Sequence, residues 1–143
     1  MLLEREDVNP NQPDTKYGGT PLLWAAVNGH DRIVNMLLER DDVNPDQPDT
    51  INGQTPLSWA AENGHEAIVK MLLEREDVNP DQPDTKYGQT PLSWAAENGH
   101  EGIVKMLLER NNVRTATLKN QNQAPLSLAL SKGHHGVLRI LRE

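Results

Sequence analysis

Apolar positions along this chain recur at helical spacing in pairs of short stretches, and each pair is separated by a polar turn. Leu22, Ala25 and Ala26 follow the spacing i, i+3, i+4, which places them on one face of a helix. A second stretch follows with its own apolar face, formed by Ile33, Val34, Leu37 and Leu38. Both patterns return further along, so we predict an all-α fold of paired amphipathic helices.

Residues at the ends of these stretches set the predicted helix boundaries. Thr20 before Pro21 is a typical helix start, with Thr as the N-cap and Pro at the first helical position. Gly29 is suited to end this helix, and a second helix is expected from about Asp31 to Glu39. The segment 9–19 contains two prolines and several turn-forming residues, so it predicts a loop.

The pattern repeats with a fixed period. Thr20, Thr55 and Thr90 each begin the motif TPL and lie 35 residues apart, and Ala124 takes the same place 34 residues later. A period of this size is typical of a stacked repeat array. We predict a single domain over residues 1–143. Its parts are a partial repeat (1–8), three repeats (9–43, 44–78 and 79–113) and a degenerate C-terminal capping repeat (114–143).

Both ends depart from the regular unit. Residues 1–8 are identical to residues 71–78, the end of a unit, so we expect either a fragment of a longer array or a short N-terminal cap. In the last unit, Arg142 stands where the others have the second Leu of a Leu-Leu pair. A polar residue at such a place is what a terminal capping repeat requires.

Composition narrows the class of partner. The formal net charge is −7, and this acidic balance argues against nucleic acid or an anionic membrane surface as the main partner. Cysteine is absent, which fits a reducing compartment and excludes thiol chemistry. No apolar run is long enough for a membrane span, and the first residues do not form a signal peptide. We expect a cytoplasmic, monomeric protein.

The motifs TPLLWAA, TPLSWAA and APLSLAL, each followed by NGH or KGH and, in three of the four units, by IV-x-x-LL, resemble ankyrin repeats. The sequence of the loops is similar to that of ankyrin arrays in filamentous-fungal NLR-like receptors. One departure concerns the family's His after TPL, which normally ties neighbouring units together. Its place is taken by Leu23, Ser58, Ser93 and Ser127. That part of the hydrogen-bond network must be rebuilt or absent.

The resemblance implies an L-shaped unit of two antiparallel helices and a projecting loop or β-turn. The first helices would line a concave groove, and the loop tips would form fingers. Proteins of this family bind other proteins through the groove and the fingers. The resemblance therefore implies a protein-protein interaction module without enzymatic activity or cofactor, and we expect it to be part of a larger intracellular receptor or scaffold.

Tryptophan occurs once per complete unit, on the face of the first helix that points away from its partner helix. Two interpretations stay open: a ladder of binding residues, or packing between neighbouring units. With the ladder interpretation, the expected groove residues are Trp24, Asn28, Trp59, Glu62, Asn63, Trp94, Glu97 and Asn98. The glutamates predict an acidic rim, which favours a protein or peptide partner with apolar and basic side chains.

The loop tips differ among otherwise very similar units. Units 44–78 and 79–113 differ at only five positions, and two of these lie at the tip. The tips are therefore candidate binding positions, formed by Lys16, Tyr17, Ile51, Asn52, Lys86 and Tyr87.

Other chemistry is weakly indicated. The histidines His30, His65, His100 and His134 recur once per unit, too far apart for one zinc ion, so we expect a turn-stabilising hydrogen bond rather than a metal site. Ser58 and His65 lack a placed acid for a catalytic triad. Asp42, Asn44 and Asp46 match the first ligand positions of an EF-hand calcium loop, but the residues required at its later positions are missing. Two alternatives remain beside partner binding: a structural spacer without a ligand, and a calcium-stabilised solenoid.

Overall fold

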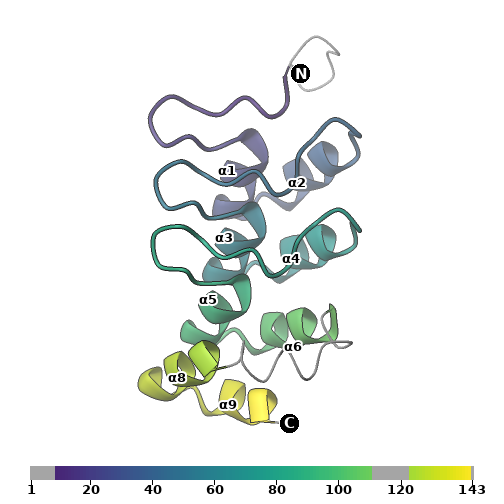
Figure 1. The fold of residues 1–143 in the computed structure, drawn as a ribbon. Coiled ribbons are helices and arrows are strands. Elements are labelled where there is room, and N and C mark those ends of the chain that lie inside the picture. The colour runs from purple at the N-terminus through teal and green to yellow at the C-terminus, as the bar shows by residue number, and fades with distance from the viewer. Residues whose placement is uncertain (1–8, 111–122, 143) are drawn as a thin grey trace.

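The computed structural model describes residues 9–110 and 123–142, which contain eight helices and no strand. The helices come in pairs that stack along one axis (Figure 1). Their bounds are α1 Pro21–Asn28, α2 Asp31–Leu38, α3 Pro56–Asn63, α4 Glu66–Leu73, α5 Pro91–Glu97, α6 Glu101–Arg110, α8 Gln123–Lys132 and α9 His135–Arg142. The predicted all-α array of paired helices is confirmed; the predicted partial repeat 1–8 lies outside the described residues.

The predicted helix caps are present. The Thr20 hydroxyl accepts a hydrogen bond from the Leu23 amide at 3.1 Å, and Pro21 takes the first helical turn. Thr55 and Thr90 cap the next two first helices in the same way. Gly29 ends α1 with φ of 74°, a conformation that residues with a side chain rarely adopt. The tight Gly-His turn then folds each second helix back against the first.

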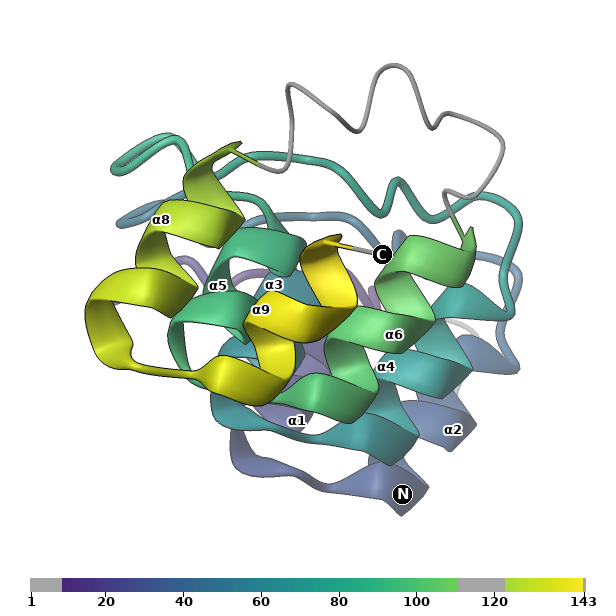
Figure 2. The same cartoon turned by 90° about the horizontal axis from the view of Figure 1, so that it is seen from below.

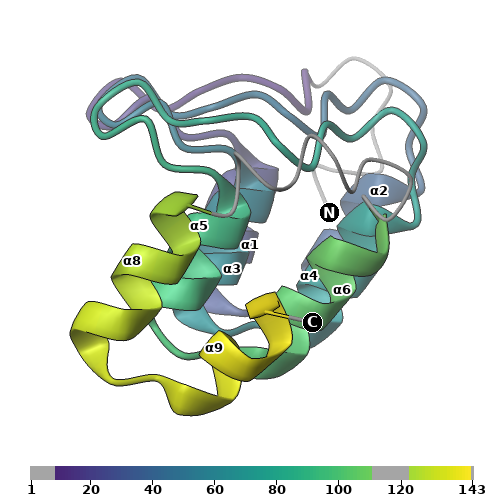
Figure 3. The ribbon, with the colours of Figure 1, turned by 60° about the horizontal axis from the view of Figure 1, so that its bottom comes forward.

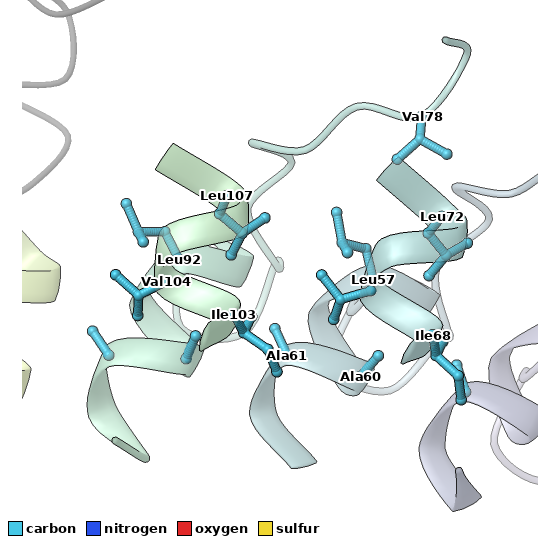
Figure 4. Packing of buried hydrophobic residues seen from close by; sticks show 14 of the residues in the cluster. Leu57, Ala60, Ala61, Ile68, Leu72, Val78, Leu92, Ile103, Val104 and Leu107 are labelled. Atoms are coloured by element: carbon cyan, nitrogen blue, oxygen red, sulfur yellow. The ribbon is translucent and has the colours of Figure 1, made fainter. Parts of the chain in front are cut away.

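The first helices form one row and the second helices another, while the long loops project to one side (Figures 2 and 3). The core lies between the rows and continues from unit to unit. Leu57, Leu72 and Leu107 are at most 1% exposed, and Ile103 points toward Ala61 of the preceding unit (Figure 4). The shared core explains how a chain without Phe folds, since each unit packs on its neighbours.

Ile33 differs from its equivalents. It is 38% exposed, whereas Ile68 and Ile103 are fully buried. These isoleucines face the preceding unit, and Ile33 belongs to the first unit whose helices the structure describes. Ile33 is predicted on the apolar face of α2, and it remains more exposed there than its equivalents in the next two units.

The unit-to-unit ties use the histidines of the Gly-His turns. His65 Nε2 lies 3.1 Å from the Val27 carbonyl, His100 Nε2 lies 3.0 Å from the Glu62 carbonyl, and His134 Nε2 lies 2.9 Å from the Glu97 carbonyl. A carbonyl only accepts, so each Nε2 carries the proton. The sequence predicts that these histidines stabilise their own turns, whereas each of the three rings binds a backbone carbonyl of the preceding unit. These bonds join neighbouring units, which is the role expected of the His that this chain lacks after TPL.

Within the described ranges, no helix has the length and apolar character needed to cross a membrane.

Candidate functional site

Each projecting loop, here called a finger, is built around one aspartate. In the second finger, Asp49 Oδ1 accepts hydrogen bonds from the backbone amides of Ile51, Asn52 and Gly53, at 3.0, 2.6 and 3.2 Å. Asp14 and Asp84 hold the first and third fingers in the same way. The carboxylate adds to a backbone bond across the base of the finger, from the Asp49 amide to the Gln54 carbonyl at 3.0 Å, so the finger tips have fixed positions.

The same aspartates hold the tryptophans. The indole Nε1 groups of Trp24, Trp59 and Trp94 donate to Asp14, Asp49 and Asp84 at 2.7, 2.8 and 3.0 Å. Trp24 is 36% exposed, and the other two indoles are half-buried. Each indole therefore connects a first helix to its own finger, a role that neither sequence interpretation contained. The repeated ten-residue spacing from Asp to Trp was the available signal.

Neighbouring fingers are joined through their backbones. The Tyr17 carbonyl accepts from the Thr50 amide and hydroxyl at 3.3 and 3.2 Å. The Asn52 carbonyl accepts from the Thr85 amide and hydroxyl and from the Lys86 amide, at 3.0, 3.2 and 3.1 Å. The fingers thus form one continuous row rather than independent loops.

Two of the three finger tips carry an aromatic stack. Tyr17 meets Trp24 edge to face with ring centroids 5.7 Å apart, and the Lys16 ammonium lies 5.0 Å from the centre of the Tyr17 ring. Tyr87, Trp94 and Lys86 repeat this arrangement at 5.9 and 5.2 Å. The middle finger has Ile51 and Asn52 instead, and Ile51 is 57% exposed. The middle finger therefore presents an aliphatic tip between two aromatic ones.

A pocket of about 310 Å³ lies between the first two fingers and the helices behind them. Its wall combines groove and tip positions: Tyr17, Trp24, Ile51, Asn52 and Trp59, together with Leu23, Val27 and Asp49. The structure thus brings together five of the side chains proposed from the sequence, and it adds three that were not. We refer to this space as the upper pocket.

The next step along the groove is polar and acidic. The Gln54 amide donates to Glu62 at 2.9 Å, and the Gln89 amide donates to Glu97 at 3.2 Å. Burial raises the pKa of Glu62 above its ordinary value; the Gln54 hydrogen bond opposes this, and the charges of Glu97 and Asp84 add to it. The predicted acidic rim is therefore a cluster of mutually repelling carboxylates, here called the acidic step.

The three predicted groove asparagines are exposed and hydrogen-bond to backbone carbonyls. The amides of Asn28 and Asn98 donate at 2.9 Å to the carbonyls of Trp24 and Trp94, one turn earlier on the same helix. Asn63 instead reaches the preceding unit and donates to the Val27 carbonyl at 3.2 Å. Each of the three side-chain amides thus donates one hydrogen bond to the backbone.

Asp42, Asn44 and Asp46, the possible calcium ligands, each accept a hydrogen bond from another group of the protein. Asp42 forms an ion pair with Arg40 at 2.8 Å, and the hydrogen bond from that guanidinium lowers the pKa of Asp42. Asn44 Oδ1 accepts from the Asp46 amide at 3.1 Å, and Asp46 Oδ2 accepts from the Asn79 amide at 2.8 Å. Within 9–110 and 123–142, no group of three or more His, Cys, Asp or Glu is arranged to hold a metal ion.

Comparison with known families identifies this architecture. A model described as ankyrin repeats matches three overlapping stretches, residues 1–84, 42–118 and 76–143, which together cover the chain. A comparison with curated proteins gives no match.

Proposed function

The chain belongs to the ankyrin repeat family, and from this premise we propose that it is a protein-protein interaction module that binds its partner in the groove between fingers and first helices. Ankyrin repeats are in general protein-interaction modules rather than enzymes. The observation that carries the proposal is the upper pocket, where an exposed aliphatic tip and two indoles from successive units surround one space. Trp is over-represented among the residues that dominate the binding energy of protein interfaces.

The proposed contact surface follows the groove. It comprises the groove positions Trp24, Asn28, Trp59, Glu62, Asn63, Trp94, Glu97 and Asn98, and the tip positions Lys16, Tyr17, Ile51, Asn52, Lys86 and Tyr87. We propose a protein or peptide partner with apolar and basic side chains, engaged by a monomeric array inside the cell. We also propose that the array is part of a larger receptor or scaffold protein, because its loop sequences resemble arrays of filamentous-fungal NLR-like receptors.

The fixed fingers support binding of a partner in one defined pose. Because Asp49 and the finger-to-finger bonds hold the tips, little conformational entropy is lost when a partner is bound. A structural spacer has no need for an exposed Ile51 at a rigid tip, although it would need the same core.

The test is affinity capture on immobilised protein with matched surface variants. The groove variant Ile51→Lys/Asn52→Tyr installs the tip residues of the third finger. Because the third finger already folds with these residues, we expect the variant to fold as well. The control Lys70→Ala removes an exposed residue of α4, on the second-helix row. Partners captured by the parent and the control but not by the groove variant support the proposal. If all three proteins capture the same partners equally, or if none of them captures a partner, the structural-spacer alternative is favoured.

The calcium-stabilised alternative has its own measurement. Thermal unfolding in calcium and in a chelator should coincide if Asp42 and Asp46 serve only as turn and tie residues. A midpoint higher in calcium by more than a few degrees would revive an ion site.

A further inference from the structure

The groove is not uniform along its axis, because the first unit differs from the other two at three positions, two of which, Leu23 and Val27, line the upper pocket. Gly19, Leu23 and Val27 in the first unit replace Gln54, Ser58 and Glu62 in the second. In the second unit these three side chains form a connected polar network, with Gln54 donating to Ser58 and Glu62 at 3.3 and 2.9 Å. The upper pocket is therefore apolar, whereas the acidic step further along the groove carries carboxylates.

The upper pocket offers no site for a cation. Asp49 is its one carboxylate, and the side chain is 6% exposed. Its Oδ1 accepts three backbone amides, and its Oδ2 accepts the indole of Trp59. Both oxygens of Asp49 therefore already accept hydrogen bonds, and the rest of the pocket wall is largely aromatic and aliphatic. The pocket thus suits one bulky apolar side chain.

The acidic step has the opposite character. Glu62 and Glu97 each accept a hydrogen bond from a neutral glutamine amide. Within the part of the chain that the structure describes, neither has a cationic side chain within 4.0 Å; the ion pairs found there join Arg40 to Asp42 and Arg75 to Asp77. Partial burial raises the pKa of Glu62, and the negative charges of Glu97 and Asp84 add to this, so an incoming cation would relieve an unfavourable interaction.

We propose that the groove binds an extended peptide segment with two different anchors, a bulky apolar side chain in the upper pocket and a Lys or Arg at the Glu62–Glu97 step. This rests on the proposed function and gives the partner a defined chemistry. The charge complementarity decides the occupant, because a purely apolar segment would leave the carboxylates uncompensated.

The spacing between the anchors follows from the geometry of the array. The two steps lie one unit apart, and stacked helices are separated by about 10 Å. An extended chain advances about 3.3 Å per residue, so the two anchors should be about three residues apart. The recognised pattern is an apolar residue, two intervening residues and a basic residue, in one of the two chain directions.

The test begins with a random-sequence peptide library displayed on phage and selected on the full chain. Selected peptides are then synthesised with a fluorescent label, and their affinities are measured by anisotropy against three proteins. These are the parent, Ile51→Lys/Asn52→Tyr, which changes the upper pocket, and Glu62→Gln/Glu97→Gln, which neutralises the acidic step. Circular dichroism and urea unfolding confirm that each variant is folded.

We expect peptides with the apolar–basic pattern, weakened roughly tenfold or more by the pocket variant and roughly tenfold by the neutralised variant. Added salt should reduce the second effect more than the first. The two-anchor pattern would be overturned by peptides whose affinity depends on the upper pocket but that carry no basic residue, or whose affinity is unchanged by Glu62→Gln/Glu97→Gln. Either result would leave the proposed function standing. Selection of no peptide, or of peptides indifferent to both variants, would count against both.

Discussion

The indole Nε1 of Trp59 lies 2.8 Å from Oδ2 of Asp49, ten residues earlier in the chain, so one hydrogen bond connects a groove helix to its finger. Asp49 is buried, and its other oxygen already holds the finger tip. The position of the tip and the position of the indole therefore depend on each other.

Trp59→Phe should destabilise the fold by about 1.5–3 kcal/mol, because it removes a donor from a buried carboxylate. Urea unfolding measures this directly. Trp24→Phe is the matched comparison: its partner Asp14 is more exposed, so water can replace the lost donor and the loss should be smaller. Equal losses at both positions would show that ring volume matters more than the hydrogen bond.

Asp46→Asn should stabilise the protein near neutral pH by about 1 kcal/mol. Its first-unit equivalent, Asn11, accepts from the Asn44 amide and also donates to the Asp42 carbonyl, both at 2.7 Å. Asp46 accepts from the Asn79 amide, but its Oδ1 is buried without a hydrogen-bond partner. The reverse change, Asn11→Asp, should destabilise; a loss of stability in Asp46→Asn would disprove the equivalence.

The gain from Asp46→Asn should depend on pH. Burial raises the pKa of Asp46; the Asn79 amide opposes this, and the charge of Asp77 adds to it. A raised pKa in the folded state means that ionised Asp46 destabilises the fold as the pH rises through that value. The gain should therefore be largest near neutral pH and shrink as the pH falls through the raised pKa of folded Asp46, and it should be lost below the ordinary value of 3.8, where Asp46 is protonated in both states. Urea unfolding across the acid range checks this.

Asp14 should show the opposite sign. Hydrogen bonds from the Tyr17 amide and then from the Trp24 indole lower the pKa of Asp14 to about 2. Its ionised form thus stabilises the fold above the ordinary value of 3.8, and this contribution is lost as the pH falls toward about 2. Asp14→Asn should be less stable than the parent at neutral pH, and the two should converge near the lower value. A difference that does not vary with pH would assign the effect to shape alone.

His100→Ala should cost about 1–2 kcal/mol of stability, because it leaves the Glu62 carbonyl without its bond from the next unit. Loss of a tie between units should also broaden the unfolding transition, since an array unfolds as one only while its interfaces are strong. His30→Ala is the control, because His30 lies exposed at the first described turn. Comparable effects at both positions would argue that the ring acts within its own turn.

Arg142→Leu tests the proposed capping role of the last unit. Arg142 is exposed at the end of α9, where the other units have a half-buried Leu. The substitution should change the free energy of unfolding by less than about 0.5 kcal/mol and increase self-association through the added apolar surface. Sedimentation velocity measures the association. Unfolding of the variant would instead assign Arg142 a structural contact.

The helices could be predicted because their signals are local. Thr20, Pro21 and Gly29 fix one helix by rules that involve neighbouring residues only, and the structure follows them. The side-chain partners could not be predicted in the same way. A helical wheel gives the direction of Trp59 from its own axis, but it does not show that a finger folds back to meet the indole. Likewise, the carbonyl that His65 binds lies 38 residues earlier, in a different unit.

The candidate site could be predicted from the sequence only in part, for the same reason. Single-unit reasoning found the tryptophans and the tips, but the upper pocket exists only between units, where Val27 and Leu23 of the first unit face Trp59 and Ile51 of the second. The replacement of the Gln-Ser-Glu network by Gly19, Leu23 and Val27 was visible in the sequence as an aligned difference. Its consequence became clear only from the structure, which places Leu23 and Val27 in the wall of the upper pocket.

The histidine ties have a direction, and this matters while the protein is being made. The Val27 carbonyl receives its bond from His65, and the Glu62 carbonyl receives its bond from His100, always from the later unit to the earlier one. On the ribosome, each unit therefore remains unfinished until the Gly-His turn of its successor, 38 residues behind, has emerged from the exit tunnel. Synthesis from the N-terminus then completes the array one unit at a time, in the order of translation.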